Sequence, residues 1–144
     1  RFMDSFEYVI ECQESVKTCK IHKMIFQPFI ENAILHGMAD VEHGGLLKVQ
    51  IREQDEERLA FIVSDNGQGM SKEQMEAIFV RRMNAGNSIG VLNVLARLDL
   101  YYGSAYSIHV DSSEGKGTTI ETVIPRQCMR SDQEEIRENT DSGR

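Results

Sequence analysis

The most constraining feature of this chain is an apolar run, Leu59 to Ser64, that is followed at once by the glycine-rich loop Asp65–Gly69. A continuous apolar run of this length is typical of a central strand that is covered on both faces. Glycine at alternate loop positions favours a tight turn, because glycine adopts backbone conformations that other residues avoid. The chain is therefore expected to be built around a sheet whose central strand ends in a glycine turn.

Further strands are predicted where apolar and polar residues alternate with a period of two. These segments cover residues 6–12, 47–52, 106–110 and 118–124. Helical spacing of apolar residues predicts helices over residues 23–37, 71–79 and 90–101. Pro28 lies inside the first of them and predicts a kink or a late helix start.

The resulting order of elements, β-α-β-β-α-α-β-β, predicts the fold class. Adjacent strands joined by short turns form antiparallel pairs, so the sheet is expected to be mixed and mostly antiparallel, with about five strands. Three helices on one face of this sheet would make a two-layer α/β sandwich.

Length, charge and cysteine content exclude several classes of protein. The 144 residues predict one domain over residues 1–126 and a polar, disordered tail over residues 127–144. The net charge of −7 argues against binding to nucleic acid or to an anionic membrane surface. No apolar run is long enough to span a bilayer. The three cysteines have no CxxC spacing, which predicts reduced thiols in a cytosolic compartment rather than a disulfide framework or a zinc site.

Four segments carry the candidate chemistry: QPFIENAILHG (27–37), SDNGQGM (64–70), SIGVLNVLARLDLYYG (88–103) and GKGTTIETVIP (115–125). Taken singly, a glycine loop after a strand is often only a tight turn, and an asparagine in a helix is usually a surface or core residue. Their order and spacing together resemble the ATP-binding domain of the GHKL superfamily. Within it, they are most similar to sensor histidine kinases of the LytS/YesM type. The resemblance implies a Bergerat-type fold with ATP and Mg²⁺ as ligands.

The resemblance implies that Asp65 accepts a hydrogen bond from the amino group of adenine. A carboxylate selects adenine because guanine presents a carbonyl at that position. Read without the family, Asp65 is an Asx-turn residue, and a methionine after the loop is ordinary core packing. The other residues that the resemblance assigns to the base are Gly67, Gly69 and Met70, with Thr118 or Thr119 supporting Asp65 through a water.

The resemblance also implies a metal and phosphate end of the site. Asn32 would bind Mg²⁺ through its side-chain oxygen, which is a hard ligand for a hard cation. His36 lies one helical turn further on and would contact the ribose or phosphates, or be purely structural; Glu31 would touch the metal or only support its ligands. An ATP lid is expected over residues 80–87. Phosphate oxygens would bind backbone N–H groups at the start of the third helix, over Ser88, Ile89, Gly90 and Val91.

Two departures from the family pattern bear on the reaction. Leu35 stands where many relatives have a basic residue near the phosphates. Pro28 stands where ATP-hydrolysing relatives have a glutamate base, which favours phosphoryl transfer to a histidine over hydrolysis.

No residue of the chain is expected to be the phosphoacceptor, because none of its four histidines lies in a dimerisation helix. The chain is interpreted as an excised catalytic domain of a two-component kinase. Its expected partners are the histidine-bearing dimerisation helices and a response regulator. Its expected location is the cytoplasmic side of a bacterial inner-membrane sensor. Two alternatives remain open: an anti-sigma-type serine kinase, and a non-catalytic nucleotide-binding module. The second would be favoured by Leu35 and by Ser88, which stands where the family often has a glycine.

Overall fold

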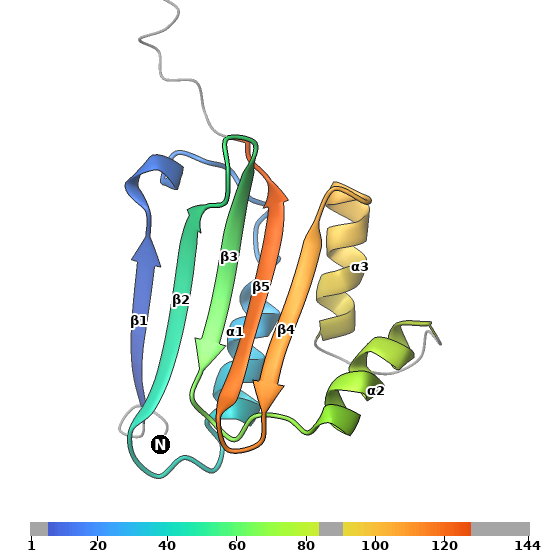
Figure 1. Ribbon diagram of the computed structural model, residues 1–144. Helices are drawn as coiled ribbons and strands as arrows, with labels where there is room; N and C mark the ends of the chain where they lie inside the picture. Colours follow the sequence, from blue (N-terminus) through green and yellow to red (C-terminus); the bar gives the residue numbers. More distant parts are fainter. Residues whose placement is uncertain (1–5, 84–90, 128–144) are drawn as a thin grey trace, which may run out of the picture.

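The structure, a computed structural model, describes residues 6–83 and 91–127. They contain one five-stranded sheet with the strand order β1-β2-β3-β5-β4 (Figure 1). The strands are β1 (Phe6–Cys12), β2 (Gly45–Glu53), β3 (Arg58–Asp65), β4 (Ser107–Ser113) and β5 (Gly117–Pro125). β1 pairs with β2 in parallel, and the remaining neighbours pair antiparallel. The apolar run therefore forms the central strand, as predicted.

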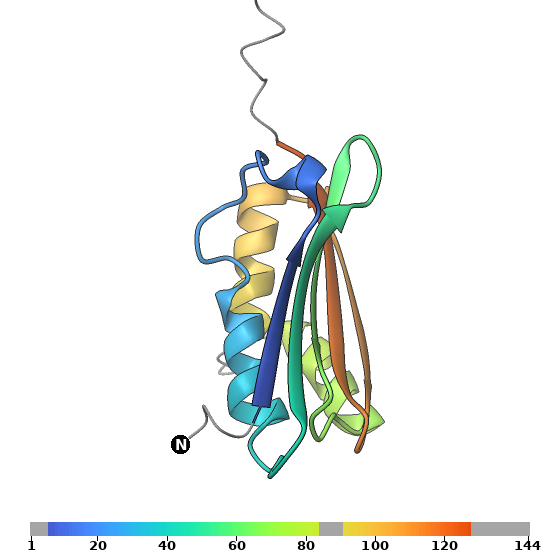
Figure 2. The same ribbon diagram turned by 90° about the vertical axis from the view of Figure 1, so that its left-hand side faces the viewer.

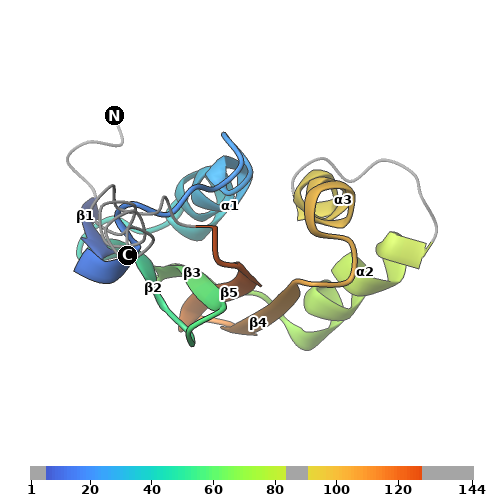
Figure 3. The same ribbon diagram turned by 90° about the horizontal axis from the view of Figure 1, so that it is seen from above.

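The helices of the described residues are α1 (Gln27–Asn32), α2 (Lys72–Met83) and α3 (Val91–Tyr102). α1 continues directly into a π-helical turn, η2 (Ala33–Gly37), and a short 3-10 turn, η1 (Glu14–Val16), follows β1. Figures 2 and 3 show that α1 and α3 lie on the same face of the sheet and that α2 lies beyond β4. The predicted element order and two-layer fold are confirmed. The prediction that β3 is covered on both faces is wrong, because α1 and α3 cover only one face.

The hydrophobic core fills the space between α1, α3 and the covered face of the sheet. Alternation along each strand sends every second side chain into this core. The buried apolar side chains in it include Phe29, Leu47, Val49, Phe61, Val63, Val94, Leu98, Ile120 and Ile124. The rings of Phe26 and Phe61 stack with centroids 3.9 Å apart, which anchors the residue before α1 on the central strand.

Three of the differences between the observed and predicted element boundaries bear on the site. The first helix begins at Gln27, so Pro28 lies in its first turn, where its missing N–H costs nothing. α2 extends to Met83, so the first residues of the expected lid are helical. β4 continues to Ser113, three residues beyond its predicted end, so the turn before β5 covers only residues 114–116.

Some predictions fall on residues outside the described ranges. These are the rest of the lid, Ser88 to Gly90, and all of the tail except Gln127. Of the two described cysteines, Cys12 is a free thiol and Cys19 is disulfide-bonded, so the expectation of reduced thiols is wrong for Cys19. Within residues 6–83 and 91–127, no helix has the length and apolar character needed to cross a bilayer.

Candidate functional site

Asp65 is the last residue of β3, and its side chain points to the helix-covered side of the sheet. It is 9% exposed, and Oδ1 accepts a hydrogen bond of 2.9 Å from the backbone N–H of Gly67. Burial raises the pKa of Asp65 above its ordinary value, because the charged carboxylate loses hydration. Backbone N–H groups of Gly67 and Thr118 partly offset this shift. The site thus holds a desolvated carboxyl group in a fixed orientation.

The loop that follows Asp65 is tied to three neighbouring segments. Gln68 donates to the end of η2, from its backbone N–H to the Gly37 carbonyl (3.0 Å) and from Nε2 to the His36 carbonyl (2.6 Å). The Asn66 side chain accepts from the backbone N–H of Leu46 at 2.6 Å. The Gln68 carbonyl accepts from the N–H of Gly115 in the β4–β5 turn at 2.7 Å. These bonds fix the loop between α1, β2 and the hairpin.

The two glycines of the loop are required by neighbouring protein backbone. A Cβ on Gly67 would overlap the carbonyl of Gly37 at the end of η2. A Cβ on Gly69, which has φ of +67°, would overlap the carbonyl of Ser113. The family resemblance assigns both glycines to the base, whereas in the structure the neighbouring protein backbone already requires them.

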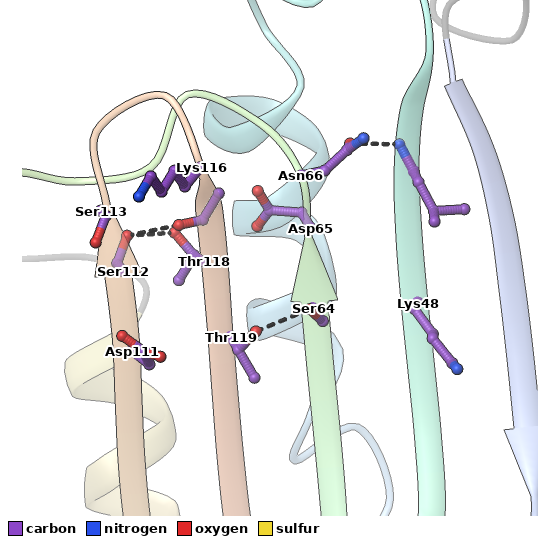
Figure 4. A pocket seen from close by; sticks show the side chains of 12 residues that line it. Lys48, Ser64, Asp65, Asn66, Asp111, Ser112, Ser113, Lys116, Thr118 and Thr119 are labelled. Carbon is purple, nitrogen blue, oxygen red and sulfur yellow. Dashed lines mark hydrogen bonds between the residues drawn. The ribbon is translucent and has the colours of Figure 1, made fainter.

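The two candidate threonines lie on opposite faces of the sheet (Figure 4). Thr118 pairs with Asp65 across β3 and β5, so it shares the helix-covered face, and its Oγ1 lies 2.8 Å from Oγ of Ser112. Thr119 pairs with Ser64 on the other face, where their hydroxyl oxygens are 2.8 Å apart. Only Thr118 is placed to support Asp65.

A cavity of about 380 Å³ opens at this end of the sheet, across β2, β3, β4 and β5 (Figure 4). Most of the residues that line it have polar side chains, among them Lys48, Asp65, Asn66, Asp111, Lys116 and Thr118. Lys48, Asp111 and Thr119 belong to the face without helices, since Leu47, Val110 and Thr118 face the core side. The cavity therefore lies mainly on the uncovered face and reaches Asp65 around the ends of the strands.

Asn32 and His36 lie on the helix that contacts Asp65. Asn32 ends α1, its side chain is half-buried, and it has no hydrogen bond to any described residue. The π turn that follows is closed by the N–H of Met38 donating to the carbonyl of Ala33 at 2.9 Å. His36 is exposed. Glu31 is also exposed and accepts a 2.8 Å hydrogen bond from Nε2 of Gln27. Its side chain is therefore hydrogen-bonded within the surface of α1.

The remaining candidates are placed as follows. Met70 is half-buried, and its backbone N–H donates to Oγ of Ser112 at 2.9 Å. Leu35 is 56% exposed on η2. Val91 is the first residue of α3, one residue after the predicted helix start, and Ser88, Ile89 and Gly90 lie outside the described residues.

Three residues contribute contacts to this site that the sequence did not predict. Ser112 joins Met70 to Thr118, Gln68 binds two carbonyls of η2, and Gly37 lies against the Asp65 carboxylate. Ser112 lies opposite Thr118 because β4 continues to Ser113, which the sequence did not predict. No sequence pattern indicated the other two.

Comparison with known proteins agrees with this arrangement. Residues 21–127 match the family described as histidine kinase-, DNA gyrase B-, and HSP90-like ATPase. The chain is 34% identical over 127 residues to the sensor histidine kinase YpdA of Escherichia coli (strain K12), covering 88% of this chain and 21% of that protein. It is 29% identical over 125 residues to the sensor histidine kinase YesM of Bacillus subtilis (strain 168), covering 87% and 20%. The chain thus spans about a fifth of the length of these relatives.

Solved structures share the fold at low sequence identity. The histidine kinase domain of the Erythrobacter litoralis EL346 blue-light-activated kinase superposes with a TM-score of 0.61 at 17% identity, covering 84% of this chain and 52% of that one. The mycobacterial sensor histidine kinase MprB gives 0.59 at 17%, covering 87% and 85%.

Together, the match over residues 21–127 and the level of identity to YpdA identify the domain. A domain of this family implies ATP binding. The chain belongs to the histidine kinase-, DNA gyrase B- and HSP90-like ATPase family and is a catalytic domain related to those of the LytS, YesM and YpdA sensor histidine kinases.

Proposed function

We propose that this domain binds ATP together with Mg²⁺ and donates the γ-phosphoryl group to a histidine on a separate dimerisation segment of a longer kinase. The observation that carries the proposal is the buried carboxylate of Asp65, fixed by the N–H of Gly67 beside the helix that ends in Gly37. A buried acceptor in one orientation recognises the amino group of adenine and opposes the carbonyl that guanine has there.

The base would lie against the loop after Asp65. Gly67 and Gly69 let this loop pass close to η2 and the hairpin, and Met70 offers a half-buried, polarisable side chain for the face of the base. Thr118, which shares the face of Asp65, would hold a water against the carboxylate.

Asn32 fits the role of the Mg²⁺ ligand. Its carboxamide is half-buried and makes no hydrogen bond within residues 6–83 and 91–127, so its oxygen is available to a hard cation. The described residues hold no cluster of three acidic, histidine or cysteine side chains around it that would complete a metal site. This suits Mg²⁺, which is commonly held by one or two side chains together with substrate phosphates. When bound, it would neutralise charge on the transferring phosphoryl group.

Phosphoryl transfer here depends on positioning rather than on a catalytic base. The acceptor nitrogen would attack the γ-phosphorus, the bond from that phosphorus to the β–γ bridging oxygen would break, and ADP would leave. Pro28 in the first turn of α1 has no group that could activate water, which supports transfer to histidine over hydrolysis. The backbone N–H groups of Ser88 to Val91 and the start of α3 are proposed to hold the phosphates.

The partners follow from the same proposal. The acceptor helices belong to the longer kinase, and a response regulator takes the phosphoryl group onward. We place the domain on the cytoplasmic side of a bacterial inner-membrane sensor, without direct contact between this domain and lipid.

Incubation with radiolabelled ATP tests the proposal. The 144-residue chain alone should take up no label, and mixing it with a dimerisation segment of a related kinase should put acid-labile phosphate on that segment. An Asn32→Ala variant should bind ATP equally with and without Mg²⁺ and transfer no label. Acid-labile phosphate on the chain alone would contradict the proposal. Acid-stable phosphoserine on a partner would favour the serine-kinase alternative, and ATP binding without transfer would favour the non-catalytic module.

A further inference from the structure

The segment that leads into α1 is held by three residues of α3. Arg97 donates from Nη1 to the carbonyl of Met24 at 3.2 Å. The His22 ring stacks on Tyr101 with centroids 3.7 Å apart and planes at 10°, and it meets Tyr102 edge-on at 5.5 Å. One face of α3 therefore contacts residues 22–24, since residues spaced three and four apart on a helix share a face.

Met24 has an unusual backbone conformation at this contact. Its φ of +60° makes it the one non-glycine residue with positive φ in the described ranges. Such a conformation is unfavourable for a residue with a side chain and persists only where the surroundings fix it. Here the Arg97 hydrogen bond fixes the Met24 carbonyl on one side. The buried side chains of Ile25 and Phe26 fix the chain on the other.

These contacts connect two parts of the proposed nucleotide site. α1 begins at Gln27, three residues after Met24, and carries Asn32 at its end. α3 begins at Val91, directly after the segment proposed to bind phosphates. A rotation or shift of either helix would therefore change the distance between Asn32 and the start of α3 at Val91.

Arg97 has no ion pair with any described residue, whereas five other cations do. Ion pairs to carboxylates are made by Lys17, Lys48, Arg52, Arg58 and Arg126. The guanidinium of Arg97 instead spans from α3 to a backbone carbonyl. Arg97 therefore contributes a directed hydrogen bond between α3 and the segment before α1.

We infer that Arg97 is a positioning residue that sets the helix bearing Asn32 relative to the start of α3, and thereby the binding of the phosphate and metal end of ATP. The inference rests on the proposed function. It assigns Arg97 no contact with the nucleotide. Its effect is therefore confined to ligands that carry phosphates, because adenine is held by Asp65 on a different element.

Titration calorimetry of the 144-residue chain with Mg-ATP and with adenosine tests the inference. Arg97→Ala should weaken Mg-ATP binding about tenfold, the scale of one lost hydrogen bond, and leave adenosine binding unchanged. Arg97→Lys keeps a donor of similar reach and should recover most of the Mg-ATP affinity. Arg52→Ala removes an exposed arginine from the uncovered face of the sheet and serves as the matched control, with no change for either ligand.

Three results would overturn the inference: Arg97→Ala binding Mg-ATP like the wild type, Arg97→Ala losing both ligands equally, or Arg97→Lys binding no better than Arg97→Ala. If Arg97→Ala does not fold, the comparison of Arg97→Lys with wild type decides, with a small selective loss for Mg-ATP expected and no loss contradicting the inference. A wild-type chain that binds neither ligand would refute the proposed function itself, and the inference with it.

Discussion

Gly37 lies directly against the carboxylate of Asp65: a Cβ built on Gly37 would be 2.8 Å from Oδ1 and 3.0 Å from Oδ2. The end of the helix that carries Asn32 and the end of the central strand therefore meet without space for a methyl group. This contact brings the helix that carries the proposed metal residue next to the proposed adenine residue.

Gly37→Ala should damage both stability and binding. The added methyl group must displace the Asp65 carboxylate or the end of η2, and overpacking of this kind costs about 1–3 kcal/mol. Urea denaturation should report that loss, and ATP affinity should fall with it. Gly103→Asn is the control, because Gly103 has open space around it and a left-handed conformation that asparagine tolerates. Wild-type affinity in Gly37→Ala would show that Asp65 has freedom to move.

Ser112→Ala should loosen the loop from the hairpin. Oγ of Ser112 accepts from the Met70 N–H and bonds to the Gly117 carbonyl, while lying 2.8 Å from Thr118 Oγ1. Losing these partners is expected to cost about 1–3 kcal/mol, because buried groups are left unpaired. Denaturation curves of Ser112→Ala and of Ser113→Ala, which alters an exposed neighbour, provide the comparison. Equal stability of the two variants would contradict this role.

The predictability of this site from sequence differed between its parts. The continuous apolar run and the glycine loop after it placed Asp65 at the end of a central strand, because both are local properties of the sequence. Whether Thr118 or Thr119 accompanies Asp65 depends on the register between β3 and β5, which is a long-range pairing. Gln68 and Gly37 gain their importance from a contact between segments about 30 residues apart, and no local pattern encodes it. The π turn likewise looks like ordinary helix in the sequence.

Thr122→Val should stabilise the domain. Thr122 is fully buried in β5, and its hydroxyl has no hydrogen-bond partner among the described residues. Replacing an unpaired buried hydroxyl with a methyl group is expected to raise the free energy of unfolding by about 1 kcal/mol. Thr119→Val on the same strand should lower it, because that hydroxyl bonds to Ser64. Destabilisation by both substitutions would indicate that Thr122 has a partner.

The stability of the domain should also depend on pH through Asp65. Its pKa is raised on folding, so the protonated form is favoured in the folded state and ionisation costs folding free energy. The stability that Asp65 contributes is therefore present at low pH and decreases as pH rises through the raised pKa. Urea denaturation between about pH 4 and pH 8 should show wild type losing stability relative to Asp65→Asn, whose amide does not titrate in that range. A gain with rising pH would mean that the hydrogen bonds to the carboxylate outweigh its burial.

Nucleotide titration of Asp65→Asn tests the central claim most directly. The denaturation curves proposed above are the check that the variant is folded, so that a change in affinity can be assigned to the site. ATP affinity should fall about tenfold or more, because a buried charged acceptor is lost. Preference for ATP over GTP should fall as well, since a carboxamide can donate to the guanine carbonyl. Unchanged ATP affinity and unchanged discrimination would show that Asp65 does not bind adenine and would refute the account of the site.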